Sequence, residues 1–426
     1  MTPFLIYAGI FIASFFLVRA IAGGIARTGF SSLKTVTFGD ESAVTSDRRA
    51  SIISVITLFF LWATFTGSAL IPSFLHMPGP FIGEQTFVHT VQDADGNTDD
   101  ATVTFLVWDE ESHPDGEPDA PEVDPGDGFA VNDSLVIEAY GSELARLQDN
   151  DLLTRDDGTN IIAVNGREIT PGGRLEFPFG TIVMSTRGSL NIQPDQGWQM
   201  EPIWLPPPEN VAQRLVQIAT EGFRNFTLWE HLGYSLFRVV VGFILGALVG
   251  IPLGYAMGLS NWFRGWFDPI VEFMRPVPPL ALIPLVIIWA GIGETGKIVL
   301  LFLAALWIMA IAARAGVSGV NISKVHAAYS LGASKAQIMR HVIVPNSLPE
   351  IFTGARVAMG VCWGTVVAAE LVAAEQGAGM MIMVASRFQN TDIVILGIIL
   401  IGIIGFGIDI LMRWGENILV PWKGKS

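Results

Sequence analysis

Stretches of about 20 predominantly apolar residues, enough for one helix to cross a bilayer core, recur along this sequence. Only 15% of the residues are charged, against roughly 25% in soluble globular chains. The sequence therefore predicts an all-α polytopic membrane protein. We expect seven spans, at approximately 3–22, 51–72, 234–258, 276–293, 296–313, 350–374 and 393–412.

The first apolar stretch needs a separate interpretation, because a secretory signal also begins with an apolar run. Residues 3–22 lack a preceding basic segment, and Arg19 comes at the far end of the run. We therefore expect a retained membrane helix, followed by a cytoplasmic linker up to residue 50.

One segment carries the net negative charge of the chain. Residues 75–203 contain 25 Asp and Glu against 5 Arg and no Lys. Turn-forming pairs such as Asp95-Gly96 and Asn165-Gly166 separate β-rich stretches that include TVTFLVW and TIVMS. The pattern predicts a small, mainly β soluble insert, in which the polar, proline-rich residues 109–128 form a loop.

The acidic stretch DADGNTDD, residues 93–100, fits either a calcium loop or a hairpin turn. We favour the hairpin, because Gly96 does not stand at the sixth loop position. The sequence contains no GxxxxGK[ST], no HExxH and no Cys–His ligand spacing. We therefore expect no metal site and no ATP site in this chain. Its one cysteine, Cys362, rules out an intrachain disulfide.

Lysine and arginine concentrate in four short segments, at 23–50, 259–275, 314–344 and the C-terminal tail. Short loops rich in these residues stay on the cytoplasmic side of a membrane. With seven spans, the N-terminus and the acidic insert then lie outside the cytoplasm, and the C-terminus lies inside.

Residues 322–344 interrupt the apolar spans with a basic, amphipathic segment. Ser334 and Gln337 have the spacing of a capping box, so a short helix is expected to start at Lys335, after a break at Gly332. The pattern alone fits an interfacial amphipathic loop or an elbow that another protein approaches closely.

A second capping-box pair follows shortly afterwards. Ser347 and Glu350 have the same spacing, and Pro349 falls in the first turn, where its missing N–H costs nothing. We expect the next spanning helix to start there.

The order of residues in this region is informative. AAYSLGASKAQIMRHVIVPNSLPEIFTGARVAMG, residues 327–360, resembles the EAA signature of permease subunits of bacterial ATP-binding-cassette (ABC) importers. IWLPPPENVAQRL (203–215), RPVPPLALIPLVIIWAGIGETGKI (275–298) and VVAAELVAA (366–374) resemble the subfamily that imports taurine, aliphatic sulfonates, nitrate and bicarbonate, its taurine permeases most. His326 departs from the signature, which has Glu there.

The resemblance implies a type I ABC importer transmembrane fold, with about six core helices plus the extra N-terminal one. It divides the chain into 1–50, the first core helix at 51–74, a periplasmic insert at 75–203, and a core permease at 204–426 with its coupling helix at 322–344. The coupling residues it implies are His326, Ala327, Ala328, Ser330, Leu331, Gly332, Ala333, Ser334, Gln337, Arg340 and Pro345.

The resemblance also implies partners. They are a second copy of the chain, two cytoplasmic ATPase subunits that bind ATP and Mg, and a periplasmic substrate-binding protein. Membrane lipid surrounds the complex, in the bacterial inner membrane, and no nucleic acid is involved. The expected function is import of taurine or a related small sulfonate, with nitrate, bicarbonate or another small anion as the alternative. The chain itself is expected not to be an enzyme.

Glycine recurs every fourth residue along the span at 234–258. Such small-xxx-small spacing lets two helices approach closely in lipid. Static packing and a moving helix surface both fit this stripe, and we favour static packing. The glycines are Gly242, Gly246, Gly250, Gly254 and Gly258.

Prolines and one carboxylate mark the candidate translocation pathway. Prolines free backbone carbonyls, which are tolerated at membrane depth only beside protein or a water-filled cavity, so a kinked pathway-lining helix and a kink that serves packing alone both fit. Glu370 lies within an apolar run, where an ionisable side chain suggests a function, a structural ion pair or a position at the outer mouth. Arg356 is a candidate partner. Asp409 is expected to be solvated. The candidate pathway residues are Pro278, Pro279, Pro284, Trp289, Trp363 and Glu370.

Two classes of function fit these features. One is the membrane subunit of an ATP-driven importer. The other is a non-transporting membrane receptor or assembly protein that acts through its acidic outer domain. The coupling signature favours the importer, and co-purification of a separate ATPase would distinguish the two.

Overall fold

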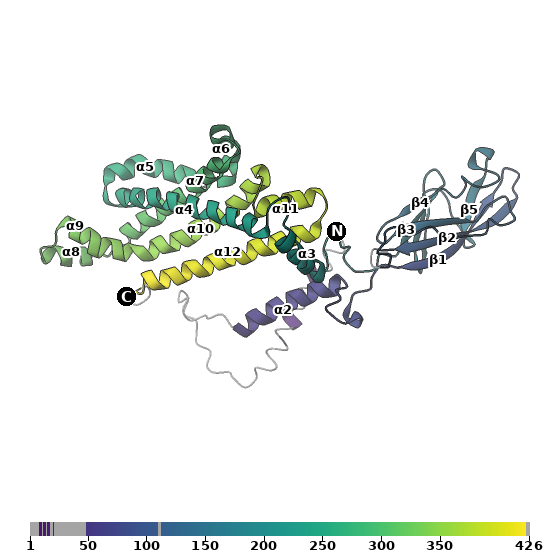
Figure 1. Cartoon of the computed structure of the whole chain (residues 1–426), viewed down its shortest axis with the longest axis horizontal. Coiled ribbons are helices and arrows are strands. Elements are labelled where there is room, and N and C mark those ends of the chain that lie inside the picture. The colour runs from purple at the N-terminus through teal and green to yellow at the C-terminus, as the bar shows by residue number, and fades with distance from the viewer. Residues whose placement is uncertain are drawn as a thin grey trace. The chain divides into compact units, whose positions relative to one another are not determined.

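The computed structural model describes residues 8–10, 12–13, 15–17, 20, 48–109 and 112–422. The chain separates into two compact units, Met1–Glu209 and Asn210–Ser426, which are described one at a time (Figure 1). Most of the expected span at 3–22 and of the linker after it lies outside the described residues.

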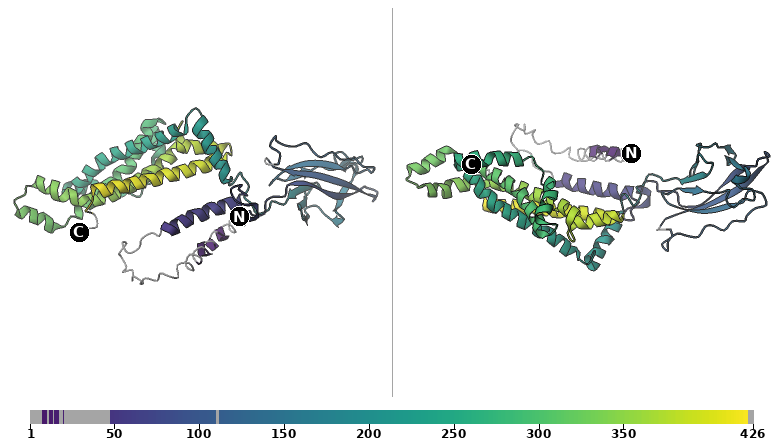
Figure 2. Two further views of the ribbon diagram at one scale, coloured as in Figure 1. Left: turned by 60° about the horizontal axis from the view of Figure 1, so that its bottom comes forward. Right: turned by 90° about the horizontal axis from the view of Figure 1, so that it is seen from above.

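The first unit contains the helix α2 (Arg48–Phe65), the short helices η2 (Ser73–Leu75) and η3 (Arg155–Asp157), and a β domain of two sheets (Figure 2). One sheet has the order β3-β2-β1-β5-β6, and the other β4-β9-β8-β7. Among the described strand pairs, β2 and β3 run parallel and the others antiparallel. The strands are β1 (Gly83–Gln92), β2 (Thr98–Trp108), β3 (Asp133–Glu138), β4 (Glu143–Ala145), β5 (Asn160–Val164), β6 (Arg167–Glu168), β7 (Arg174–Phe177), β8 (Gly180–Met184) and β9 (Leu190–Pro194).

Alternating side chains and tight turns explain why this segment folds as β structure. Along β2, every second residue from Ala101 to Val107 is buried, which is the period of a strand with one face in a core. Asp93 accepts backbone hydrogen bonds from Asp95 and Asn97 in the turn between β1 and β2, so the expected hairpin is confirmed. The mainly β character of the insert is confirmed too.

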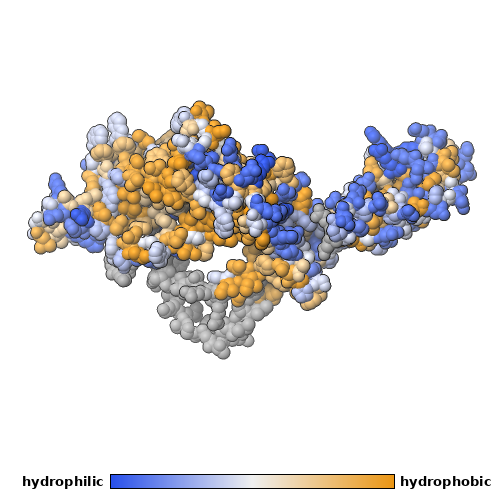
Figure 3. Space-filling model, viewed as in Figure 1, coloured by the Kyte–Doolittle hydropathy of each residue, from blue (hydrophilic) through white to orange (hydrophobic). Residues whose placement is uncertain are grey.

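The second unit is a helical bundle. Its first helix, α3 (Pro208–Glu221), begins at the boundary between the units. The other helices are α4 (Leu228–Leu259), α5 (Asn261–Met274), η4 (Pro279–Leu282), α6 (Ile283–Ala290), α7 (Glu294–Ser318), α8 (Ile322–Ser330), α9 (Lys335–Ile338), the π-helical turn η5 (Met339–Ile343), α10 (Val344–Ala373), α11 (Ala378–Arg387) and α12 (Thr391–Leu419). Large apolar side chains cover much of the visible surface of these helices, whereas polar ones cover most of the β domain (Figure 3).

Four of the described helices are long and apolar enough to cross a membrane. They are α4, α7, the continuous helix Lys335–Val372 and α12, and a bent pair formed by α5 with η4 and α6 would make a fifth. They cover the expected spans at 234–258, 296–313, 350–374 and 393–412. The apolar part of α2 is shorter, Ser51–Phe65. The number of seven spans stays a prediction.

The expected span at 276–293 is not one helix, and residues 259–275 are not a loop. The helix α5 occupies 261–274, and it is bent by 93° relative to Pro279–Ala290. Prolines break the path, because Pro278 precedes the 3₁₀ turn η4 in extended conformation and Pro279 opens that turn. Gly291, with φ +76°, ends α6 after eight residues.

The second expected capping box does not start a helix. Ser347 lies within α10, which begins at Val344 and continues the helix from Lys335. The Ser347 hydroxyl is buried, donates to the carbonyl of Val344 and lies against the Tyr255 hydroxyl. It is therefore engaged by helix packing and does not cap Glu350.

Candidate functional site

The segment with the coupling signature forms a bent helical elbow. The helix α8 is capped by Asn321 and ends at Leu331. Gly332 follows with φ +81°, a left-handed conformation that suits glycine. Ser334 and Gln337 then exchange both hydrogen bonds of a capping box at the start of α9, as the spacing predicted. The sharp bend places Leu331 at the outside of the elbow.

The elbow presents its side chains to the surroundings. Leu331 is 88% exposed and Tyr329 is 51% exposed. An added Cβ at Gly332 would meet nothing within 4 Å. Of the predicted coupling residues, Ala328, Ala333 and Pro345 are half-buried, and the exposed ones are His326, Ala327, Ser330, Leu331, Gly332, Ser334, Gln337 and Arg340.

The glycine stripe of α4 faces α7 at very short range. An added Cβ at Gly246 would lie 2.5 Å from Cβ of Ala305, and one at Gly250 would lie 2.6 Å from the carbonyl oxygen of Leu306. Real Cβ atoms do not approach so closely, so the two backbones touch only because side chains are missing here. Gly242, Gly254 and Gly258 meet α7 in the same way, at Leu301, Ala310 and Val317.

The candidate pathway residues are not gathered at one place by hydrogen bonds or ion pairs among the described residues. Pro278, just before η4, is exposed, as are Pro284 and Trp289 on α6, and Pro279 at the start of η4 is half-buried. Trp363 is buried in α10, and its indole N–H donates to the carbonyl of Ile401 at 3.1 Å.

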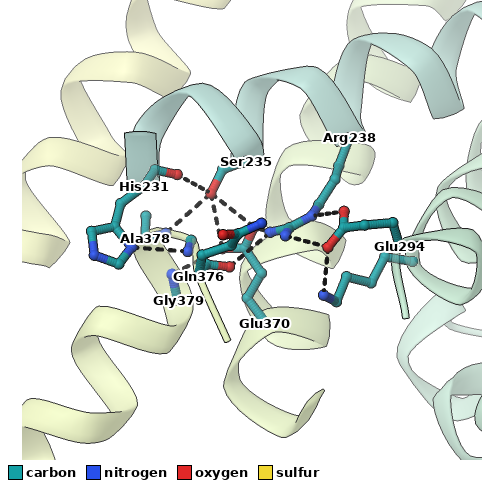
Figure 4. A network of polar contacts seen from close by, with 10 residues as sticks. His231, Ser235, Arg238, Glu294, Glu370, Gln376, Ala378 and Gly379 are labelled. Atoms are coloured by element: carbon teal, nitrogen blue, oxygen red, sulfur yellow. Dashed lines mark hydrogen bonds and ion pairs between the residues drawn. The ribbon is translucent and has the colours of Figure 1, made fainter. Parts of the chain in front are cut away.

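Glu370 lies in a buried polar network at the start of α4 and α7 and the end of α10 (Figure 4). Arg238, fully buried, donates from Nη1 to Glu370 Oε1 at 2.6 Å. It also forms two bonds of 2.6 Å with the carboxylate of Glu294. Lys297 Nζ reaches Glu294 Oε1 at 3.0 Å. Two cations and two carboxylates thus balance one another, which keeps buried charges tolerable.

The same network binds the turn between α10 and α11. Glu370 accepts hydrogen bonds from Ser235 Oγ and, at 3.0 Å, from the backbone N–H of Gly379. His231 Nδ1 accepts from the Gly377 N–H. An added Cβ at Gly377 would lie 2.5 Å from Glu370 Oε2. A residue with a side chain at this position would therefore collide with the carboxylate. Helix α4 is thereby joined to the end of α10.

The partner of Glu370 was not predicted correctly. Arg356, the candidate, instead pairs with Asp409 at 3.3 Å and Glu416 at 3.6 Å. Asp409, expected to be solvated, has a side chain that is 34% exposed and also binds Arg413 at 2.8 Å. The available signal for Arg238 was an arginine inside an apolar run, the same rule that singled out Glu370.

Chemically, the network is suited to holding helices together. Each cation is ion-paired, and the Ser235 hydroxyl is engaged with the Glu370 carboxylate. No group of three or more metal-ligating side chains occurs among the residues that the structure describes. The arrangement fits a membrane bundle with a surface elbow.

Comparison with known proteins defines the class of this membrane bundle. The sequence profile of the binding-protein-dependent transport system inner membrane components matches residues 242–417. A taurine permease is 49% identical over 259 residues, 94% of its own length. The chain belongs to this family of ABC transporter permeases.

That relative is the taurine transport system permease protein TauC of Escherichia coli K12, and the match covers 59% of this chain. The putative aliphatic sulfonates permease SsuC of the same organism is 39% identical over 53% of this chain and 84% of its own. The nitrate import permease NrtB of Synechococcus elongatus is 30% identical, with 51% and 81% covered. These relatives are transport permeases.

Solved structures that resemble this chain include the inward-facing MetNI methionine ABC transporter. It has 19% identity and a TM-score of 0.38, over 49% of this chain and 97% of that one. An amino acid ABC transporter has 20% identity and a TM-score of 0.38, over 45% and 91%.

Proposed function

We propose that this chain is the permease subunit of an ABC importer that carries taurine or a related small sulfonate across the bacterial inner membrane. The observation that supports this substrate class is the 49% identity across 94% of a taurine permease. Nitrate and bicarbonate are the alternative, because a nitrate permease is also a relative, at 30% identity. A separate binding protein delivers the substrate and a separate ATPase supplies the energy.

Uptake into vesicles tests the substrate. The permease is reconstituted with its ATPase and binding protein, and ATP-dependent uptake of labelled taurine is measured. We expect uptake that excess alkanesulfonate reduces and that excess nitrate or bicarbonate leaves unchanged. Binding of the same compounds to the isolated binding protein is the control. Transport of nitrate or bicarbonate without transport of taurine would reject the assignment.

The elbow of α8 and α9 is the proposed contact with the ATPase. Its support is the signature sequence, the exposed Leu331 at the bend and the small side chains of Ala327 and Ala333 beside it. A chain has one such elbow, so we propose two copies of the chain in a complex with two ATPase subunits. Native mass spectrometry of the purified complex would check these copy numbers.

Substitutions at Gly332 separate docking from backbone strain. Gly332→Glu places a long charged side chain at the elbow, and we expect loss of ATPase association and uptake. Gly332→Asn is the matched control, because asparagine tolerates the left-handed conformation and stays small. We expect this variant to retain ATPase binding. Normal ATPase binding by Gly332→Glu would show that the elbow is not the contact.

We further propose that the β domain contacts the docked binding protein. Its support is the excess of acidic residues in 75–203, because charge of one sign steers partners over roughly 8 Å at physiological salt. Replacing 78–202 by a Gly/Ser linker should leave the bundle and its ATPase assembled. It should weaken the stimulation of ATP hydrolysis by the binding protein, most strongly at low salt. Unchanged stimulation at low salt would exclude this role.

A further inference from the structure

The segments that connect the β domain to its flanking helices differ in composition from the domain itself. We call residues 66–82 and 196–207 the neck. Residues 66–82 contain no Asp, Glu, Lys or Arg, and Glu201 is the one charged residue of 196–207. The strands and loops between them are strongly acidic. Charge is therefore absent where the chain leaves α2.

Backbone hydrogen bonds hold the two halves of the neck together. The N–H groups of Trp198 and Gln199 donate to the carbonyl of Pro78 at 2.8 and 3.2 Å. The Met200 N–H donates to the carbonyl of Phe65, the last residue of α2. The neck is thus a paired structure that is attached directly to the end of this helix.

A second set of contacts fixes the loop after α2. Glu209 accepts from the Ser68 hydroxyl at 2.6 Å and from the Ala69 N–H at 2.8 Å. The His76 ring lies 3.0 Å from the carbonyl of Ser68. Trp62 Nε1 donates to the carbonyl of Pro206. These bonds satisfy polar groups of the loop and leave its apolar side chains on the outside.

Large apolar side chains stand out from this fixed frame. Phe74 is 82% exposed, Trp204 72% and Leu70 58%. The Trp204 indole N–H donates to the Glu201 carboxylate, so this ring has an apolar body and a satisfied polar end. Tryptophans of this kind are enriched where a membrane meets water.

The apolar surface of helix α2 suggests that lipid covers the exposed side chains of the neck. The apolar part of this helix, Ser51–Phe65, extends about 22 Å, less than the roughly 30 Å of a bilayer core. Between Ile52 and Phe60 it exposes several large apolar side chains. The neck continues this apolar surface beyond the end of the helix, with Leu70, Phe74 and Trp204 exposed.

We infer that the neck, through Leu70, Phe74 and Trp204, is an interfacial membrane anchor that seats the β domain on the lipid surface. Because the β domain is acidic, an anionic lipid surface repels it, and apolar contact must supply the attachment. This inference does not depend on which substrate the permease carries.

Spin labels measure the depth of the neck directly. The native Cys362 is buried, so labels attach at introduced cysteines. Phe74→Cys and Trp204→Cys report on the neck, and Leu152→Cys is the matched control, a 75% exposed apolar residue of the β domain. The full chain is reconstituted in phosphatidylcholine–phosphatidylglycerol vesicles. Collisions with oxygen, which partitions into lipid, are compared with collisions with a water-soluble nickel chelate.

We expect a several-fold higher ratio of oxygen to nickel collisions at positions 74 and 204 than at 152. Equal ratios at the three positions would overturn the inference. A joint fall of both collision rates at 74 and 204 would also overturn it, because the neck would then be covered by protein. As a second measurement, Phe74→Ser with Trp204→Ser should lower the ratio of a label at Leu70→Cys toward that of position 152.

Discussion

The β domain and the helical bundle differ in how they accommodate buried titratable side chains. In the described part of the bundle, the buried charged residues are Arg238, Lys297, Glu370 and Glu416, and each has an ion-pair partner. In the β domain, His89 is fully buried on β1, and neither ring nitrogen has a hydrogen-bond partner in the described structure. The bundle thus pairs its buried charges, whereas the β domain buries a histidine without a hydrogen-bond partner.

The surroundings explain the difference. A helix bundle in lipid has no water to stabilise an unpaired charge, so its buried charges must be balanced inside the bundle. A domain in water can bury a histidine by keeping it neutral. Burial lowers the pKa of His89 to about 4, against the attraction of Asp100 and Asp99. The comparison predicts strong effects of packing and pairing in the bundle and pH effects in the β domain.

The largest effect is expected where α4 touches α7. Gly254→Leu would drive a side chain into Ala313, whose Cβ lies 2.6 Å from an added Cβ, and into the backbone of Ala310. Overpacking costs about 1–3 kcal/mol where neighbouring side chains can shift. Here the Ala310 backbone blocks such a shift, so we expect α4 and α7 to lose their packing altogether. We expect little monodisperse protein in detergent by fluorescence-detected size exclusion.

Gly233→Leu is the matched control for this substitution. It lies in the same helix, and an added Cβ there would meet nothing within 4 Å. We expect a normal elution profile. Equal behaviour of the two variants would contradict tight packing of α4 on α7.

The next effect concerns the pair of Arg238 and Glu370. Removing one partner of a buried pair costs about 3–5 kcal/mol, so Glu370→Ala should lower thermal stability strongly and impair uptake. Arg238→Met with Glu370→Leu removes both charges and leaves Glu294 paired with Lys297. We expect this double variant to recover stability, measured by thermal unfolding in detergent.

Uptake by the double variant then decides what Glu370 does. If Glu370 takes part in translocation, transport stays low although stability returns. Full recovery of both would show that the pair is only structural. Arg275→Ala is the comparison, because its side chain is 65% exposed and that of its partner Glu272 is 45% exposed. Its effect should be within about 1 kcal/mol.

The third effect is the pH dependence of the β domain. Because the pKa of His89 is lower in the folded state than its ordinary value of 6.5, the domain loses stability as pH falls from about 6.5 toward 4. The loss is on the order of 3 kcal/mol. His89→Leu should remove it, because neutral packing replaces a group that the unfolded state protonates. Hydrogen exchange of β1 and β2 peptides at pH 5 and 8 would measure the difference.

Asp133 should change the stability of the β domain with pH in the opposite direction to His89, so it serves as an internal control. Burial raises its pKa to about 7, so its contribution is present at low pH and is lost as pH rises from about 4 through 7. Asp133→Asn should improve protection at pH 8 and leave the acid loss caused by His89 in place. The same pH profile in wild type and His89→Leu would show that His89 does not control acid stability.

Much of the fold follows from local patterns in the sequence. Apolar runs indicated α4, α7 and α12, and alternation with turn residues indicated the β domain. The capping box at Ser334 and the break at Gly332 also appear as predicted. Such features depend on near neighbours in the chain, whose spacing the sequence states directly.

The contacts between distant elements depended on the tertiary structure. Arg238 and Glu370 stand 132 residues apart, and no local period shows that their helix faces meet. Likewise, Ser347 could cap a helix by its spacing, but packing against Tyr255 placed it inside one. The apolar neck shows the same division: its composition is plain in the sequence, whereas the exposure of Phe74 and Trp204 results from backbone pairing between segments more than 100 residues apart. Burial and pairing depend on which surfaces of distant elements come into contact. The sequence therefore indicated the candidate side chains, and only the tertiary structure determined which of them are buried, paired or exposed.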